Sequence, residues 1–316
     1  MLTDRPFAQL VRHFFTRFFD NDWAPPGTEI TTTVTQALAL LAVPGLLLPL
    51  SFTSRYAYLW HHPSLPAAQL TWNHKYLFIT YAMGVMGMLA VLEWDSLFPD
   101  LRDFHILTPL PLPRGAMFGA QVGALLLFLL LFSVAVNGPS CFLFPFVAGL
   151  PAVAPGGLAR FFLGHAVTVF CASWFVFFLV VALEGILLLL LTPRAFRRAS
   201  PYCQFIALSL LAALFFLYKE VAPYLPSLHH PSLKIMQVLP TMWFLGLYET
   251  LLGRQDPLFA ELARRALVAL AAVTAAAVVS YVLAYRRHAR RSLEASPLEE
   301  GGPSPLVDLL TRWVNR

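Results

Sequence analysis

The chain has 316 residues, of which 58% are hydrophobic and only 12% are charged, and its mean hydropathy is +0.66. Soluble globular domains are about 45–50% apolar and about 25% charged, so this composition excludes an ordinary soluble protein and predicts a polytopic membrane protein. The formal net charge of +5 does not predict a nucleic-acid partner, because most basic residues flank apolar segments, where they orient a chain in the bilayer.

Residues 6–19, PFAQLVRHFFTRFF, carry apolar side chains at helical spacing, with Arg12, His13 and Arg17 on the opposite face. A basic face opposite phenylalanine and leucine is typical of a helix that lies in the membrane interface. The alternative is a soluble amphipathic helix. The apolar segment that follows favours the interfacial interpretation.

Six apolar segments are long enough to predict membrane-spanning helices. They lie at about residues 33–50, 76–92, 116–136, 161–191, 203–217 and 266–283. The segment 237–253 is apolar but short, which predicts a re-entrant element rather than a crossing. We therefore predict an all-α integral membrane unit over residues 1–291, followed by a cytoplasmic linker and short amphipathic tail over 292–316.

Lysine and arginine are distributed unequally between the two sides of this predicted topology. With six crossings, the side that holds both termini carries 14 of these residues and the other side carries 8. Since the more basic side is cytoplasmic, both termini are predicted to be cytoplasmic. If 237–253 crossed instead, the basic cluster at 286–291 would lie outside, which supports the re-entrant interpretation.

The connection between the second and third predicted spans, residues 93–117, is charged, rich in proline and amphipathic. Its acids are Glu93, Asp95, Asp100 and Asp103, and its bases are Arg102 and Arg114. Apolar residues between them give the segment a side that can lie on the membrane surface. This pattern predicts a short helix presented to a soluble partner.

These features together resemble the membrane subunit of an ABC-2 type exporter. An amphipathic helix precedes the first span, and a short re-entrant element with the sequence LPTMWFLGLYETLLG lies between the last two. The connection LRDFHILTPLPLPRGAMFGAQ (101–121) resembles the loop of that family, in which an acidic helical stretch precedes a leucine-proline element and a basic residue. The chain departs from the family at Gln121, where members often have lysine.

The resemblance implies a permease in a bacterial-type plasma (inner) membrane, with a coupling helix in the connection that contacts a separate ABC ATPase. The residues expected to form this ATPase-coupling loop are Asp95, Phe98, Asp100, Arg102, Asp103 and Phe104. The chain has no G-x-x-x-x-G-K-[ST] motif, so ATP hydrolysis is expected in another subunit and this chain is not expected to be an enzyme. Six spans form half a pore, which implies a homodimer or a second permease subunit.

Glu184 is the strongest candidate for a functional residue within the membrane. It lies in the apolar run VVALEGILLLLL, and a carboxylate in hydrocarbon is costly unless it faces a cavity or a partner. A structural hydrogen bond to another helix is an equal alternative. Proton-coupled transport is a third, which the absence of a second polar residue nearby in the sequence disfavours.

Two other function classes remain open from the sequence. Glu93, Asp95, Asp100, Asp103 and His105 could bind a divalent metal in a membrane-bound lipid-processing enzyme, and a membrane scaffold without transport is the third class. The motif HHPSL occurs at 61–65 and 229–233, but it lacks the spacing of strong metal sites. We therefore predict no cofactor, no resident metal and no catalytic residue, and membrane lipids as the remaining partners.

Overall fold

The computed structural model describes residues 4–19, 30–62, 67–98, 114–149 and 156–294. Within these ranges the chain forms helices and connecting turns, with no β-strand. Six of the helical stretches are long and apolar enough to cross a membrane. The prediction of an all-α, multi-pass membrane protein is therefore confirmed.

The described part of the chain contains the following helices. They are α1 (Asp4–Arg17), α2 (Ile30–Ser51), α3 (Thr53–His61), α4 (Ala67–Leu92), α5 (Trp94–Leu97), α7 (Arg114–Ala148), α8 (Leu158–Leu190), α9 (Pro193–Val221), the 3-10 helices η1 (Ala222–Ser227) and η2 (Pro231–Val238), α10 (Pro240–Leu251) and α11 (Pro257–Glu294). The candidate spans are α4, α7, α8 and α11, the joined pair α2 and α3, and α9 continued by η1.

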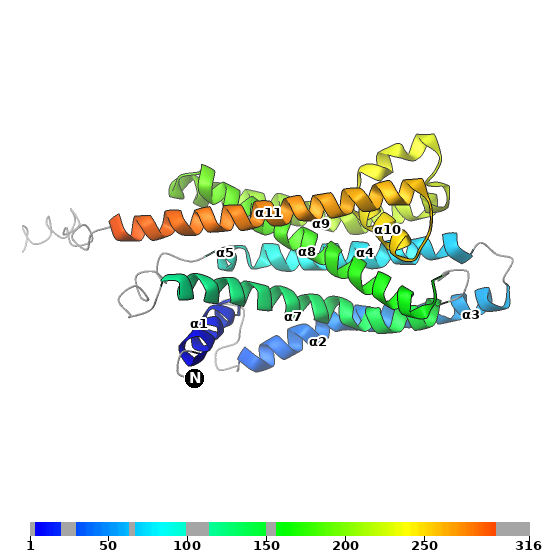
Figure 1. The fold of residues 1–316 in the computed structure, drawn as a ribbon, viewed down its shortest axis with the longest axis horizontal. Helices are drawn as coiled ribbons and strands as arrows, with labels where there is room; N and C mark the ends of the chain where they lie inside the picture. Colours follow the sequence, from blue (N-terminus) through cyan, green and yellow to red (C-terminus); the bar gives the residue numbers. More distant parts are fainter. Residues whose placement is uncertain (1–3, 20–29, 63–66, 99–113, 150–155, 295–316) are drawn as a thin grey trace, which may run out of the picture.

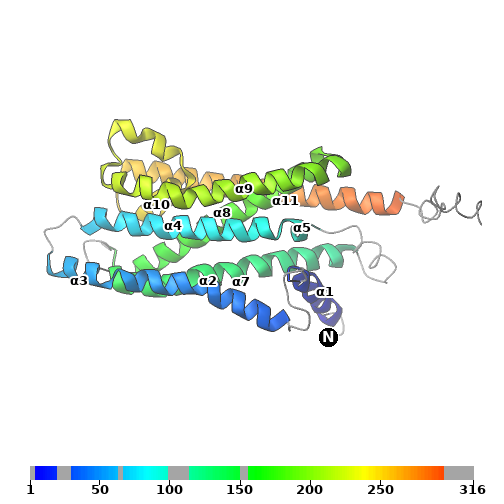
Figure 2. The same cartoon turned by 180° about the vertical axis from the view of Figure 1, so that it is seen from behind.

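The long helices lie side by side along the long axis of the molecule (Figures 1 and 2). One end of the bundle, here called the α1 end, holds α1, α5, the start of α7 and the ends of α8 and α11. The opposite end, here called the α10 end, holds α3, the start of α4, the start of α8 and α10. The first and last described helices therefore reach the same end.

α10 has 12 residues, and at 1.5 Å per residue it is about 18 Å long, shorter than the roughly 30 Å of a hydrocarbon core. It packs against α4, α8 and α11. The contact with α11 is very close, because a Cβ atom added to Gly246 would lie 2.3 Å from Cβ of Leu262. The absence of a side chain at this position is what lets the two backbones approach.

Several helices extend beyond the apolar segments that predict them. α4 begins at Ala67, ahead of the predicted start at residue 76, because Thr71, Trp72 and Lys75 are buried against neighbouring helices. α7 continues to Ala148 with Pro139 and Pro145 in its interior, past the predicted end at residue 136. Proline removes a backbone hydrogen bond, which neighbouring helices in a bundle can compensate.

α4 is the most buried of the candidate spans, whereas α2 and α9 are mostly exposed. The exposed side chains of α2 and α9 include large apolar residues such as Leu40, Leu47, Phe205 and Phe216. Surfaces of this kind suit contact with lipid rather than water. The polar residues of interest lie instead inside the bundle, near its two ends.

Candidate functional site

The N-terminal helix α1 packs its apolar side onto α7. Leu10, Phe14 and Phe18 are buried, and the rings of Phe18 and Phe128 are 4.7 Å apart. Arg12 and His13 are exposed on the opposite side. The apolar side of this amphipathic helix is thus packed against protein, and its basic side is exposed.

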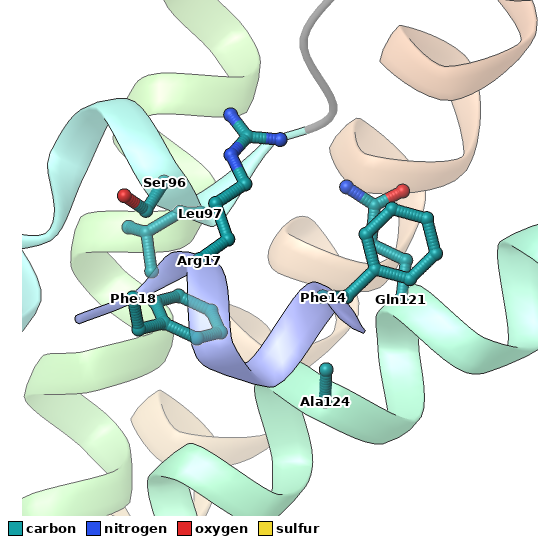
Figure 3. Close-up of a pocket in the computed structure, with 7 residues that line it drawn as sticks. All are labelled: Phe14, Arg17, Phe18, Ser96, Leu97, Gln121 and Ala124. Atoms are coloured by element: carbon teal, nitrogen blue, oxygen red, sulfur yellow. The ribbon is translucent and has the colours of Figure 1, made fainter. Parts of the chain in front are cut away.

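Arg17, at the end of α1, connects this helix to α5. Its Nη2 atom donates hydrogen bonds to the carbonyl oxygens of Asp95 and Phe98, each at 3.3 Å. Arg17 also lines a small pocket together with Phe14, Phe18, Ser96, Leu97, Gln121 and Ala124 (Figure 3). The beginning of the predicted coupling loop is therefore held by the N-terminal helix.

The structure describes two of the six predicted coupling-loop residues, and they lie differently. The side chain of Asp95 is exposed. Phe98 is 4% exposed, and its ring centroid lies 4.8 Å from that of Tyr281 on α11. Phe98 therefore anchors the loop in the bundle instead of offering a surface to a partner. Asp100, Arg102, Asp103 and Phe104 lie outside the described residues.

Glu184 lies beside this anchor. It is 2% exposed on α8, and a Cβ atom on the neighbouring Gly185 would be 2.5 Å from Oγ of Ser280 and 3.0 Å from Cζ of Phe98. Among the residues that the structure describes, Oε2 of Glu184 and the hydroxyl of Tyr281 have no hydrogen-bond partner. The carboxyl group of Glu184 also interacts electrostatically with Asp95 and Arg17. Glu184 therefore lies at the α1 end.

Glu93, between α4 and α5, makes the stability of this end sensitive to pH. Burial raises the pKa of its carboxyl group to about 7, partly opposed by a hydrogen bond with Ser96, whereas an unfolded glutamate has a pKa of about 4.3. The folded state therefore binds the proton more tightly, and stability should fall as pH rises from about 4 to about 7 and level off above that. Thermal unfolding of the wild type and Glu93→Gln across this range tests this.

Glu93→Gln should flatten the pH dependence, because glutamine does not titrate. Asp95→Asn is the matched control, since Asp95 is exposed on the adjacent helix. Equal slopes for the wild type and Glu93→Gln would contradict the assignment.

A second polar centre, which the sequence did not reveal, lies at the α10 end. Nζ of Lys75 on α4 lies 2.6 Å from Oε1 of Glu249 on α10, and both side chains are fully buried. Arg254, just after α10, forms an ion pair with the other carboxylate oxygen. Lys75 also lies 5.0 Å from the ring centroid of Tyr248. We call Lys75, Glu249 and Arg254 the buried ionic centre.

Further hydrogen bonds lie beside the buried ionic centre, inside the bundle. Nδ1 of His165 lies 2.9 Å from the hydroxyl of Tyr248, and its Nε2 lies 3.3 Å from Oγ of Ser140. Deeper in the bundle, Nδ2 of Asn137 donates to Oγ of Ser173 at 2.9 Å. α7, α8 and α10 are thus joined by polar side chains as well as by apolar packing.

The two HHPSL copies do not form a metal site in the described part of the chain. His61 and His62 are exposed at the end of α3, and His229 forms an ion pair of 2.7 Å with Asp256. Across the described residues, no three histidine, cysteine, aspartate or glutamate side chains are close enough to hold a metal. Of the five residues of the alternative metal cluster, only Glu93 and Asp95 are described.

In comparisons with protein-family models, curated proteins and solved structures, the chain has no match.

Proposed function

We propose that this chain is the membrane-spanning permease subunit of an ATP-binding-cassette exporter, with both termini cytoplasmic. In this proposal the α1 end faces the cytoplasm of a bacterial-type cell, α1 lies in the membrane interface and α10 is a re-entrant element on the outer side. The observation that carries the proposal is the double attachment of the loop that begins at Phe98. Arg17 holds its backbone to α1, and the Phe98 ring packs against Tyr281 of α11.

This attachment supplies a mechanical connection from the loop to the spans. A partner that displaces residues 99–113 pulls on Phe98, which contacts α11 directly and lies against Gly185 of α8. Since packed helices shift as rigid elements, a small displacement there moves α8 and α11 relative to α4. Hydrolysis of ATP in the partner subunit would provide the free energy for that movement.

The roles of the six loop residues divide accordingly. Asp95, Asp100, Arg102, Asp103 and Phe104 contact the ATPase in this proposal, with the charged residues setting orientation and specificity. Phe98 transmits the displacement inward. A second copy of the chain, or another permease subunit, completes the pore, and membrane lipids surround the apolar faces of α2 and α9.

Charge reversal in the loop should separate the chain from its ATPase. We expect Asp100→Lys/Asp103→Lys to abolish co-purification of an ABC ATPase with the tagged protein in mild detergent, because like charges then meet across the interface. Wild-type protein should retain the ATPase. Mass spectrometry of the purified complex is the measurement.

The matched control is Glu299→Lys/Glu300→Lys, which makes the same change in charge in the C-terminal segment and should leave the complex intact. Retention of the ATPase by the loop variant would contradict the assignment of these aspartates. If no ATPase co-purified even with wild-type protein, the permease proposal itself would fail.

A further inference from the structure

We propose that the buried ionic centre binds an anionic group, phosphate or carboxylate, of the molecule that the permease moves. In the described structure the Glu249 carboxylate takes the place of that group between Lys75 and Arg254. The inference rests on the proposed function for its role in transport, but binding of the anion can be tested without the ATPase.

The charges of the centre do not balance. Lys75 and Arg254 both pair with the single carboxylate of Glu249, and within the described residues no second acidic side chain pairs with either cation. Uncompensated charge is costly away from water, and this excess is positive; it is shared by the fully buried Lys75 and by Arg254, whose side chain is 25% exposed. The electrostatics of the centre therefore favour a second anion over a cation.

Part of the centre reaches the surface at the α10 end. The side chain of Arg254 is 25% exposed, in contrast to the complete burial of Lys75 and Glu249. Arg160 is exposed nearby and donates from Nε to the carbonyl oxygen of Leu251 at 2.5 Å. Both arginines border Gly253, since Nη1 of Arg160 lies 2.8 Å from the position of a Cβ atom there. An arriving anion thus meets two guanidinium groups before the buried lysine.

A hydrogen-bond donor without a partner lies beneath Arg254. The guanidinium carbon of Arg254 lies 6.0 Å from the centroid of the Trp72 ring. Nε1 of Trp72 is buried and, within the described part of the chain, has no acceptor. A buried unpaired N–H group is costly, and an oxygen-rich anion would supply its acceptor.

The carboxylate of Glu249 can leave the cations by a movement of α10. This helix contacts α4 through two polar links, Lys75 with Glu249 and the Thr241 hydroxyl that donates to the Tyr76 hydroxyl at 2.9 Å. Its contact with α11 includes the close packing at Gly246, and it also packs on α8, where Tyr248 bonds His165. Ion pairs and hydrogen bonds to α4 can be exchanged for a ligand, whereas the close packing cannot, so in this proposal α10 moves together with α8 and α11, and away from α4.

The test measures binding of inorganic phosphate to the purified full chain in nanodiscs of neutral phosphatidylcholine, followed by the fluorescence of Trp72 with Trp72→Phe as the signal control. We expect saturable binding to wild-type protein and at least about tenfold weaker binding to Arg254→Gln, because the accessible cation is lost. Glu249→Gln should bind about tenfold more tightly, because the competing carboxylate is removed. Arg264→Gln and Glu261→Gln, at an exposed ion pair on α11, are the matched controls and should bind as wild type does.

The second arm repeats the titration in nanodiscs that contain anionic phosphatidylglycerol. A response that needs this lipid and is lost in Arg254→Gln would support the site with a lipid headgroup as the source of the anion. Absence of saturable binding in both lipids, or equal binding by wild type, Arg254→Gln and Glu249→Gln, would overturn the inference. If Glu249→Gln does not fold, the comparison of Arg254→Gln with Arg264→Gln still decides.

Because no ATPase is present in these titrations, the result is independent of co-purification. Phosphate binding by a chain that retains no ATPase would leave the anion site in place while the exporter proposal fails. Retention of the ATPase by a chain that does not bind phosphate would support the exporter proposal and overturn the anion site.

Discussion

Replacing Glu249 with glutamine should lower the stability of the folded chain by about 3–5 kcal/mol, because the fully buried Lys75 and the partly exposed Arg254 lose the one counter-charge that they have among the described residues. The side chains of Lys75 and Glu249 are fully buried in the bundle. The double variant Lys75→Met/Glu249→Gln should be more stable than Glu249→Gln alone, since it leaves one cation instead of two. Thermal unfolding in phosphate-free detergent buffer measures both effects. Together with the single variant Lys75→Met, these proteins form a double-mutant cycle.

Glu261→Gln is the control for this experiment, because Glu261 pairs with Arg264 and Arg265 on an exposed face of α11. Exposed ion pairs contribute about 0–1 kcal/mol, so this variant should unfold close to the wild-type temperature. Equal unfolding temperatures for Glu249→Gln and the wild type would show that the carboxylate does not stabilise the two cations.

The second large effect is expected at the contact between α10 and α11. Gly246→Ala should cost about 1–3 kcal/mol, because overpacking forces neighbouring groups to move. The added Cβ atom would lie 2.3 Å from Cβ of Leu262 and 2.9 Å from the carbonyl oxygen of Phe259, which is backbone and cannot rotate away. Thermal unfolding measures the loss.

The same substitution at Gly115 provides the comparison, since a Cβ atom there meets nothing within 4 Å. Gly115→Ala should be neutral or stabilising by up to about 1 kcal/mol, because alanine restricts the unfolded chain. A destabilisation of Gly115→Ala as large as that of Gly246→Ala would show that the close approach to Leu262 is not the cause of the loss at Gly246.

Local sequence patterns were sufficient to predict the six long apolar helices, but not where they begin and end, nor the shorter α3, η1 and η2. Apolar runs reveal a span because the bilayer demands them. The polar start of α4, which includes His74 and Lys75, has no such run and therefore resembles a loop. These two residues are buried only because distant segments supply partners, Tyr56 for His74 at 2.7 Å and Glu249 for Lys75.

The same reason explains why one buried charge was predicted and another was missed. Glu184 is conspicuous because apolar residues surround it in the sequence, and it is indeed buried. Lys75 and Glu249 lie at the edges of apolar segments, where charged residues are ordinary, and they are 174 positions apart. Sequence spacing carries no signal for a contact of that range.

The buried ion pairs also affect the prediction of membrane orientation, which depends on the number of basic residues on each side. Lys75 and Arg254 were counted as loop charges on the less basic side, yet both pair with Glu249. A base that is paired inside the bundle does not interact with the membrane surface as a free loop charge does. Without Lys75 and Arg254, the less basic side holds 6 basic residues instead of 8.

The length of α7 and α8 has a consequence for the surrounding lipid. They contain 35 and 33 residues, so each is about 50 Å long, against roughly 30 Å of hydrocarbon. Even a tilt of about 40° leaves part of each helix beyond the bilayer core. The two helices are thus longer than the hydrocarbon core is thick. A change in bilayer thickness would alter the tilt of these two helices before it altered their packing.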